Sequence, residues 1–132
     1  MLRAYSKNIE VKSGNAIPFN IDKLDVGNHI SHQAGSENIN INVAGFYEVN
    51  LDISFTTVEE TTNPVNIQLY ANGNPIPDAL INTSVASTTT TVNSSFNTII
   101  EANIGMPYQK AVLTIVTDTD IQITSVAIGV DQ

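Results

Sequence analysis

Two histidines are the first side chains in the sequence that could bind a metal ion. His29 and His32 are three positions apart. On a β-strand, residues three apart point to opposite faces, so the pair would not chelate one ion. We therefore expect a surface or subunit-contact role for both. On a threefold axis, however, one histidine would occur three times and could hold an ion.

Carboxylates form a second set of candidate ligands. Asp118 and Asp120 flank a single threonine, and Asp22 and Asp25 could join them. Calcium needs several such oxygen ligands. Aspartate is also a common turn former, and we favour that interpretation here. The sequence therefore predicts no metal ligands and no cofactor.

Catalytic combinations of nucleophile and base are missing from the sequence. The chain has no cysteine and no Gly-x-Ser-x-Gly motif, so covalent catalysis lacks its parts. Paired carboxylates of the glycosidase type stay open, because five acidic residues could meet in space: Glu48, Asp52, Glu59, Glu60 and Glu101. Since Glu48 and Asp52 would share one strand face with Asn50, we interpret that face as solvated. The prediction is that the protein is not an enzyme.

The charge balance argues against nucleic acid and membranes as partners. The chain has 132 residues, a formal net charge of −8 and only 14% charged residues. Phosphate binding needs clustered Lys and Arg, but the five basic residues are scattered along the sequence: Arg3, Lys7, Lys12, Lys23 and Lys110. No segment has the length of a membrane span. Residues 1–8 lack the apolar core of a secretory signal, so we expect assembly in the cytoplasm.

Period-two alternation of apolar and polar residues dominates the chain and predicts β-strands. Residues 39–43, 47–55 and 65–71 each alternate in this way, as half-buried strands do. Asn72-Gly73 lies between two such runs and predicts a hairpin. Counting about eight to ten strands at roughly ten-residue spacing, we predict an all-β fold of two antiparallel sheets, either a sandwich or a jelly roll.

The last predicted strand changes phase. Ile121 and Ile123 share one face, whereas Val126, Ile128 and Val130 share the other. A β-bulge would explain the change. So would a strand buried on both faces, once against its own core and once against another subunit. Residues 111–116 are likewise apolar on both faces.

The chain also resembles a known family. Residues 16–20, 39–49, 67–77, 111–116 and 121–128 are similar to the C-terminal domain of the collagen-like exosporium glycoproteins, which belongs to the complement-head and tumour-necrosis-factor jelly rolls. The most specific match is Ile39, five residues, then Gly45, Tyr47 and Val49 at alternate positions. It is similar to the complement-head aromatic signature. The collagen-like stalk of the exosporium proteins is missing from this sequence.

The resemblance implies a ten-stranded jelly roll that assembles as a homotrimer and does structural or recognition work. Related domains occur in tailed bacteriophage particles, so we expect a capsid decoration or head-fibre protein on the virion surface. One alternative is a structural protein of a spore or cell surface. Another is a carbohydrate-binding adhesin tip that recognises a host-surface glycan. The expected partners are further copies of the chain and a capsid or other surface-layer protein.

Candidate contact residues follow from the resemblance and from the phase change. Tyrosine suits subunit contacts because it has a rigid apolar body and a polar tip. The candidates for the trimer interface are Tyr47, Tyr70, Tyr108, Val126 and Ile128.

Residues 1–14 are expected to form either a first strand or an attachment arm, followed by a jelly-roll domain over residues 15–132. This N-terminal segment mixes apolar side chains with much of the chain's positive charge. Its candidate attachment residues are Arg3, Tyr5 and Lys7.

Overall fold

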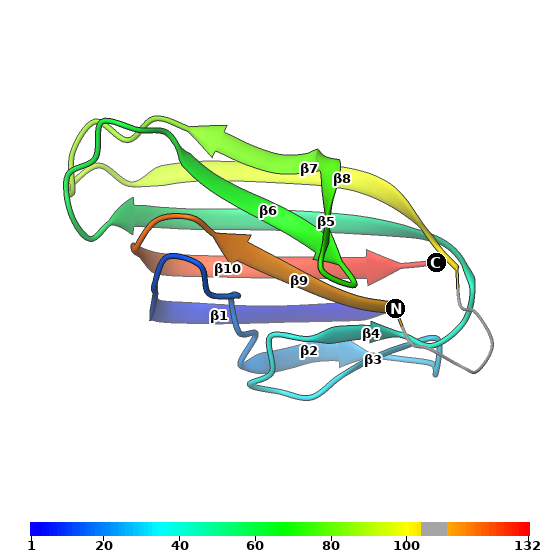
Figure 1. Cartoon of the computed structure of the whole chain (residues 1–132). Helices are drawn as coiled ribbons and strands as arrows, with labels where there is room; N and C mark the ends of the chain where they lie inside the picture. The colour runs from blue at the N-terminus through cyan, green and yellow to red at the C-terminus, as the bar shows by residue number, and fades with distance from the viewer. Residues whose placement is uncertain (104–110) are drawn as a thin grey trace.

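Ten strands form two antiparallel sheets in the computed structural model, which describes residues 1–103 and 111–132 (Figure 1). The first sheet contains β1 (Leu2–Val11), β2 (Ile21–Asp25), β5 (Gly45–Thr57), β8 (Val92–Ala102) and β10 (Ile121–Asp131). The second contains β3 (Ile30–His32), β4 (Ile39–Ile41), β6 (Val65–Ala71), β7 (Asn74–Thr83) and β9 (Ala111–Thr117). Their spatial orders are β2-β1-β10-β5-β8 and β3-β4-β9-β6-β7. The predicted all-β sandwich is confirmed.

The core lies between the two sheets and is built by the alternation seen in the sequence. On β5, five inward side chains are each at most 2% exposed: Tyr47, Val49, Leu51, Ile53 and Phe55. Burying one large apolar side chain stabilises a fold by roughly 1.5–3 kcal/mol. The residues between them point away from the core, which makes the other side of the first sheet a polar surface.

A β-bulge explains the phase change in the last strand. The pairing of β10 with β5 shifts register between Ile123 and Ser125. Its neighbour β1 changes phase at the same level, where Asn8 has a φ of 54°. Val126 and Ile128 are at most 2% exposed and therefore pack inside their own sandwich.

The Asn72-Gly73 hairpin is confirmed. Asn72 has a φ of 51° and Gly73 a φ of 80°, and the flanking residues Ala71 and Asn74 pair across the turn. Two successive positive φ angles define a type I′ turn, whose twist matches that of the strands it joins.

The N-terminal segment lies within the first sheet. Leu2–Val11 forms β1, which pairs with β2 on one side and with β10 on the other. The first and last strands of the chain are therefore neighbours (Figure 1). In residues 1–103 and 111–132 no helix is long and apolar enough to cross a membrane.

Candidate interaction face

The outer face of the first sheet, which points away from the core, is hollow along its middle. The middle strand β10 contributes only small residues to this part of the face: Ser125, Ala127 and Gly129. A groove of about 940 Å³ lies over them, and a second hollow of about 710 Å³ lies beside it. We call these hollows together the β10 groove. Its walls include Arg3, Tyr5, Lys7, Lys23, Asn50, Asp52, Ser54, Asn93, Ser95 and Asn97.

Arg3 crosses the floor of this groove at Gly129. A Cβ atom on Gly129 would lie 2.7 Å from Arg3 Nη1, so the missing side chain leaves room for the guanidinium. Arg3 Nη1 donates a 3.0 Å hydrogen bond to the carbonyl of Leu2, and Arg3 Nη2 lies 3.7 Å from Asp131 Oδ2. These contacts hold a positive charge beside β10.

Charge is divided between the two sides of the β10 groove. On the side of β1 and β2 the outer face carries Arg3, Lys7 and Lys23, which we call the basic side. On the side of β5 and β8 it carries Glu48, Asp52 and Glu101, which we call the acidic side. The five basic residues are scattered along the sequence, but strand pairing gathers three of them on one side of one face.

An apolar pair lies at one end of the acidic side. Phe46 is 64% exposed and Ile99 is 67% exposed. Phe46 pairs with Glu101 and Ile99 pairs with Glu48, so the two apolar side chains are diagonal neighbours on the same face. Neither was singled out from the sequence. The signal that could have found them is a large apolar residue at a polar position of an alternating strand.

The five candidate interface residues lie in different environments. The Tyr47 ring is fully buried on β5, and Val126 and Ile128 are buried on β10. Tyr70 is partly exposed on β6, in the second sheet. Tyr108 lies outside the described residues. Only Tyr70 among the four described candidates therefore has a side chain that reaches the surface of the single chain.

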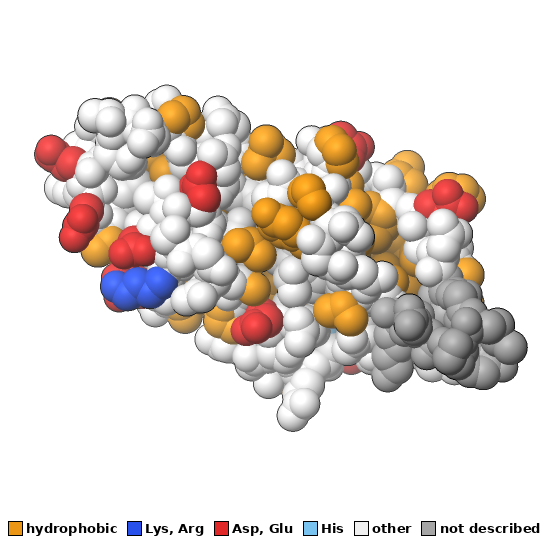
Figure 2. Space-filling model, viewed as in Figure 1, with side chains coloured by type: hydrophobic (Ala, Val, Ile, Leu, Met, Phe, Trp, Pro, Cys, Tyr) orange, Lys and Arg blue, Asp and Glu red, His pale blue; other side chains and the backbone are white. Residues whose placement is uncertain are grey.

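The outer face of the second sheet also carries apolar side chains. Figure 2 shows them gathered across the middle of the molecule on the side of this sheet. Leu80 on β7 is 41% exposed, and Tyr70, Val112 and Val116 are partly exposed. This surface is separate from the β10 groove, because the two sheets enclose the core and their outer faces point in opposite directions.

The two histidines lie apart and have different roles. His29 is exposed, and its ring contacts the Gln132 side chain. His32 is buried, which corrects the surface role expected for it. His32 Nδ1 lies 2.5 Å from Asp22 Oδ1, and His32 Nε2 lies 2.8 Å from the carbonyl of Ser36. The His32–Asp22 pair joins β3 of the second sheet to β2 of the first.

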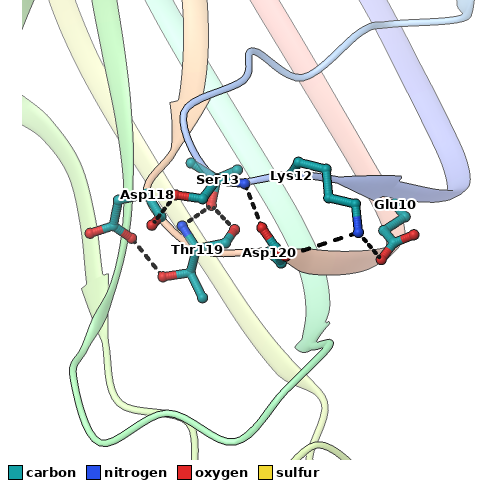
Figure 3. A network of polar contacts seen from close by, with 7 residues as sticks. Glu10, Lys12, Ser13, Asp118, Thr119 and Asp120 are labelled. Atoms are coloured by element: carbon teal, nitrogen blue, oxygen red, sulfur yellow. Dashed lines mark hydrogen bonds and ion pairs between the residues drawn. The ribbon is translucent and has the colours of Figure 1, made fainter.

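Asp118 and Asp120 fix turns (Figure 3). Asp118 accepts hydrogen bonds from the backbone amide of Asn66 at 2.9 Å and from its side-chain amide at 2.8 Å. Asp120 accepts from the backbone amide of Ser13 at 2.7 Å. Partial burial raises the pKa of Asp118, but the bonds from Asn66 and Thr119 outweigh it, so the pKa is lowered from its usual value. Within the described ranges, no three His, Asp or Glu side chains are grouped as metal ligands.

No family model matches the chain, and no curated protein matches it. Solved structures do. The PRD1 vertex protein P5 matches with a TM-score of 0.61 at 10% identity, over 98% of this chain and 93% of that chain. Rabbit GITRL matches with a TM-score of 0.60 at 12% identity, over 100% of this chain and 95% of that chain. Murine APRIL matches with a TM-score of 0.59 at 10% identity, over 99% of this chain and 98% of that chain.

The chain has the jelly-roll fold of the tumour-necrosis-factor-like proteins. The likeness extends over at least 93% of each chain compared, so the shared part is the whole jelly roll of this chain. At these identities the likeness is one of fold.

Proposed function

We propose that the chain is a non-catalytic structural protein that forms a trimeric element on a bacteriophage particle, as a capsid decoration or head-fibre protein. The observation that carries the proposal is the likeness in fold to a vertex protein over 98% of this chain. The name of that protein places it at a vertex, which supports a virion-surface location for the same fold here. The inference is an analogy between folds.

The carboxylates that could have formed a glycosidase pair support a non-catalytic role. Glu59 and Glu60 lie in the exposed loop after β5, whereas Glu48, Asp52 and Glu101 lie on the outer face of the first sheet. Glu48 Oε1 accepts hydrogen bonds from the amides of Asn50 and Asn97, at 3.1 and 3.5 Å. Its surroundings are those of a solvated surface group.

The exposed pair Phe46 and Ile99 supports assembly into a trimer. Two large apolar side chains, each about two-thirds exposed, lie together among the polar outward residues of β5 and β8. Apolar side chains grouped in this way mark contact surfaces, because burial against a partner removes them from water. Phe46 precedes Tyr47 on β5, and Ile99 precedes Ile100, the partner of Tyr47 on β8. The contact expected near Tyr47 is therefore assigned to these two neighbours on the outer face.

The trimer is tested by measuring mass in solution. Multi-angle light scattering should give about three times the 14.2 kDa of one chain. Phe46→Ser with Ile99→Ser should shift the protein toward the monomer. Leu80→Ser is the matched control, because Leu80 is exposed on the second sheet. A wild-type protein with the mass of one chain at micromolar concentration would refute the trimer.

The proposed location on a phage particle is tested by identifying the neighbouring genes and, where they encode a capsid, by co-sedimentation of the protein with that capsid. Genes for capsid and portal proteins next to this one, with binding to those capsids, would support the proposal. Sporulation genes in that position, and binding to spores instead, would favour the spore-surface alternative.

The glycan alternative has one specific observation in its favour. The β10 groove is lined by the amides of Asn50, Asn93 and Asn97, beside the ring of Tyr5. Amides that donate and accept hydrogen bonds, next to an aromatic ring, suit a sugar. A glycan array probed with the wild-type protein tests this alternative.

The attachment role of Arg3, Tyr5 and Lys7 stays a prediction. All three residues line the β10 groove. They could meet an acidic surface of a capsid protein only where the trimer leaves that groove open. Since β1 pairs on both sides, deleting residues 1–7 would disrupt the first sheet, and point substitutions are the sharper test.

A further inference from the structure

We infer that the smaller hollow of the β10 groove binds a sugar that carries a carboxylate. The inference rests on the glycan alternative proposed above and deepens it, because it assigns the position and the charge of the ligand. The hollow measures about 710 Å³, within the range of roughly 300–1,000 Å³ that is usual for small-molecule sites. We call it the lysine hollow, after Lys7 and Lys23 in its wall.

Strand pairing builds the lysine hollow from two neighbouring rows of side chains that cross four strands. The first row runs from β1 to β8 through Lys7, Ser125, Ser54 and Asn93, and the second runs the same way through Tyr5, Ala127, Asp52 and Ser95. Successive members of a row lie opposite each other on paired strands, so all eight side chains share one face of the sheet. The short side chains on β10 form the floor, and the longer ones on β1 and β5 form the walls.

Lys7 and Lys23 supply the charge that a carboxylate needs. Within the described residues neither lysine has an ion-pair partner, whereas Lys12 lies 3.3 Å from Glu10. Lys7 Nζ instead lies 5.9 Å from the centre of the Tyr5 ring. In a chain with a net charge of −8, two unpaired ammonium groups in one hollow are a specific attraction for an anion. An ammonium group also donates strong, charge-assisted hydrogen bonds to a carboxylate.

The opposite wall of the hollow selects a sugar rather than a simple anion. Asp52 lines this wall and has no ion-pair partner within the described residues. It would repel a small anion, but its carboxylate accepts hydrogen bonds from hydroxyl groups. The ligand therefore needs a negative charge at one end and hydroxyls at the other, which is the chemistry of an acidic sugar.

Two further side chains fit the neutral part of such a ligand. Ser54 Oγ donates a hydrogen bond to Asn93 Oδ1, so the amide NH₂ of Asn93 is left to donate to a sugar oxygen. Tyr5, in the wall beside Lys7, presents an aromatic ring on which the apolar face of a sugar can pack. The lysine hollow thus offers a group for each part of an acidic sugar: its carboxylate, its hydroxyls and its ring.

The lysine hollow lies far from the apolar pair that supports the trimer. Phe46 and Ser54 are eight positions apart on β5, which is roughly 26 Å at the usual rise of a strand. Ile99 is next to Phe46 on the face, whereas Asn93 pairs with Ser54. A subunit contact centred on Phe46 and Ile99 therefore need not cover the hollow.

Isothermal titration calorimetry with matched sugars tests the site. The probes are sialyllactose and an oligomer of galacturonic acid, and their neutral counterparts are lactose and the methyl ester of that oligomer. We expect at least one acidic probe to bind the wild type roughly tenfold or more tightly than its neutral counterpart, because only the acidic form pairs with the lysines. In Lys7→Gln with Lys23→Gln, this preference should be lost. Lys12→Gln is the matched control, since it removes the same charge outside the hollow and should bind as the wild type does.

The outcomes separate this inference from the proposed trimer. A wild-type trimer that binds neither acidic probe more tightly than its neutral counterpart would overturn the acidic-sugar site and leave the trimer standing. Unchanged binding in the double lysine variant, or equally strong binding of inorganic phosphate to the wild type, would also overturn it. A wild-type monomer that binds an acidic probe would refute the trimer and support the site. If circular dichroism shows that the double variant does not fold, Asn93→Ser should still weaken binding of the acidic probe.

Discussion

The hydroxyl of Tyr47 donates a 2.6 Å hydrogen bond to the backbone carbonyl of Val43, although the tyrosine ring is fully buried. The bond spans the turn that leads from β4 into β5. It fixes the start of the longest strand in the described chain, which carries much of the core on one side and the acidic side of the interaction face on the other.

Tyr47→Phe should lower the free energy of unfolding by about 1 kcal/mol. The ring would still fill its place in the core, so the loss is that of one hydrogen bond. Urea denaturation followed by tyrosine fluorescence measures it. Tyr5→Phe is the control, because the Tyr5 hydroxyl makes no hydrogen bond within the described residues and should leave the midpoint unchanged.

Tyr47 should also make the fold sensitive to alkali. Burial raises the pKa of Tyr47 above its usual value of 10.0. Because the unfolded chain releases this proton more readily, the stabilisation is complete below pH 10 and is lost as the pH rises through the folded-state pKa. Melting temperatures measured above pH 9 should therefore fall more steeply for the wild type than for Tyr47→Phe. Parallel curves would show that Tyr47 does not titrate with unfolding.

Gly73→Val should destabilise the domain by roughly 1–2 kcal/mol. Gly73 has a φ of 80° at the hairpin between β6 and β7, and a β-branched side chain is strained in that conformation. Asn72→Gly is the matched control, since glycine adopts the positive φ of Asn72 without strain. Equal denaturation midpoints for Gly73→Val and the wild type would contradict the strain argument.

His32→Phe should destabilise the domain by about 1–3 kcal/mol, although a phenyl ring resembles the imidazole in shape. It would leave the Asp22 carboxylate and the Ser36 carbonyl without the ring nitrogens that now contact them. His29→Phe, at an exposed position, should change stability by less than about 0.5 kcal/mol. Similar losses in both variants would show that the buried contacts of His32 are not what stabilises the β2–β3 link.

The strands and the hairpin could be predicted from the sequence because both depend on residues that are close together in the chain. Alternation along β5 and β6 follows from burial on one side of a strand, and Asn72-Gly73 has the residues that a type I′ turn demands. The phase change in β10 was visible but ambiguous. A bulge and a strand buried on both faces leave the same pattern of apolar residues, and only the register against β5 separates them.

The interaction face could not be predicted, because it is made by contacts between distant parts of the chain. Lys7 and Asp52 are far apart in sequence, yet both line the same hollow once β1 and β5 pair with β10. No local pattern encodes that pairing. Phe46 and Ile99 each occupy a polar position of an alternating strand, which is visible in the sequence, but only the register of β5 against β8 makes the two side chains neighbours on one face.

Asp118 should make the fold sensitive to acid. The pKa of Asp118 is lowered, since the hydrogen bonds from Asn66 and Thr119 outweigh the effect of partial burial. Its stabilisation is therefore complete above the ordinary carboxyl pKa of about 4 and is lost as the pH falls through the lower folded-state value. Thermal unfolding measured from pH 6 downward should show a loss of stability below about pH 4.

Asp118→Asn separates this contribution from the general effect of acid. The neutral amide oxygen can accept only part of what the carboxylate accepts from Asn66, so the variant should be less stable than the wild type at pH 6. The difference between the two proteins should then shrink as the pH falls, because the wild-type carboxylate becomes protonated while the amide does not change. Glu59→Gln, in the exposed loop after β5, should follow the wild-type curve throughout. A difference between Asp118→Asn and the wild type that stays constant down to low pH would mean that the lowered pKa of Asp118 does not contribute to folding, and that the variant acts through packing alone.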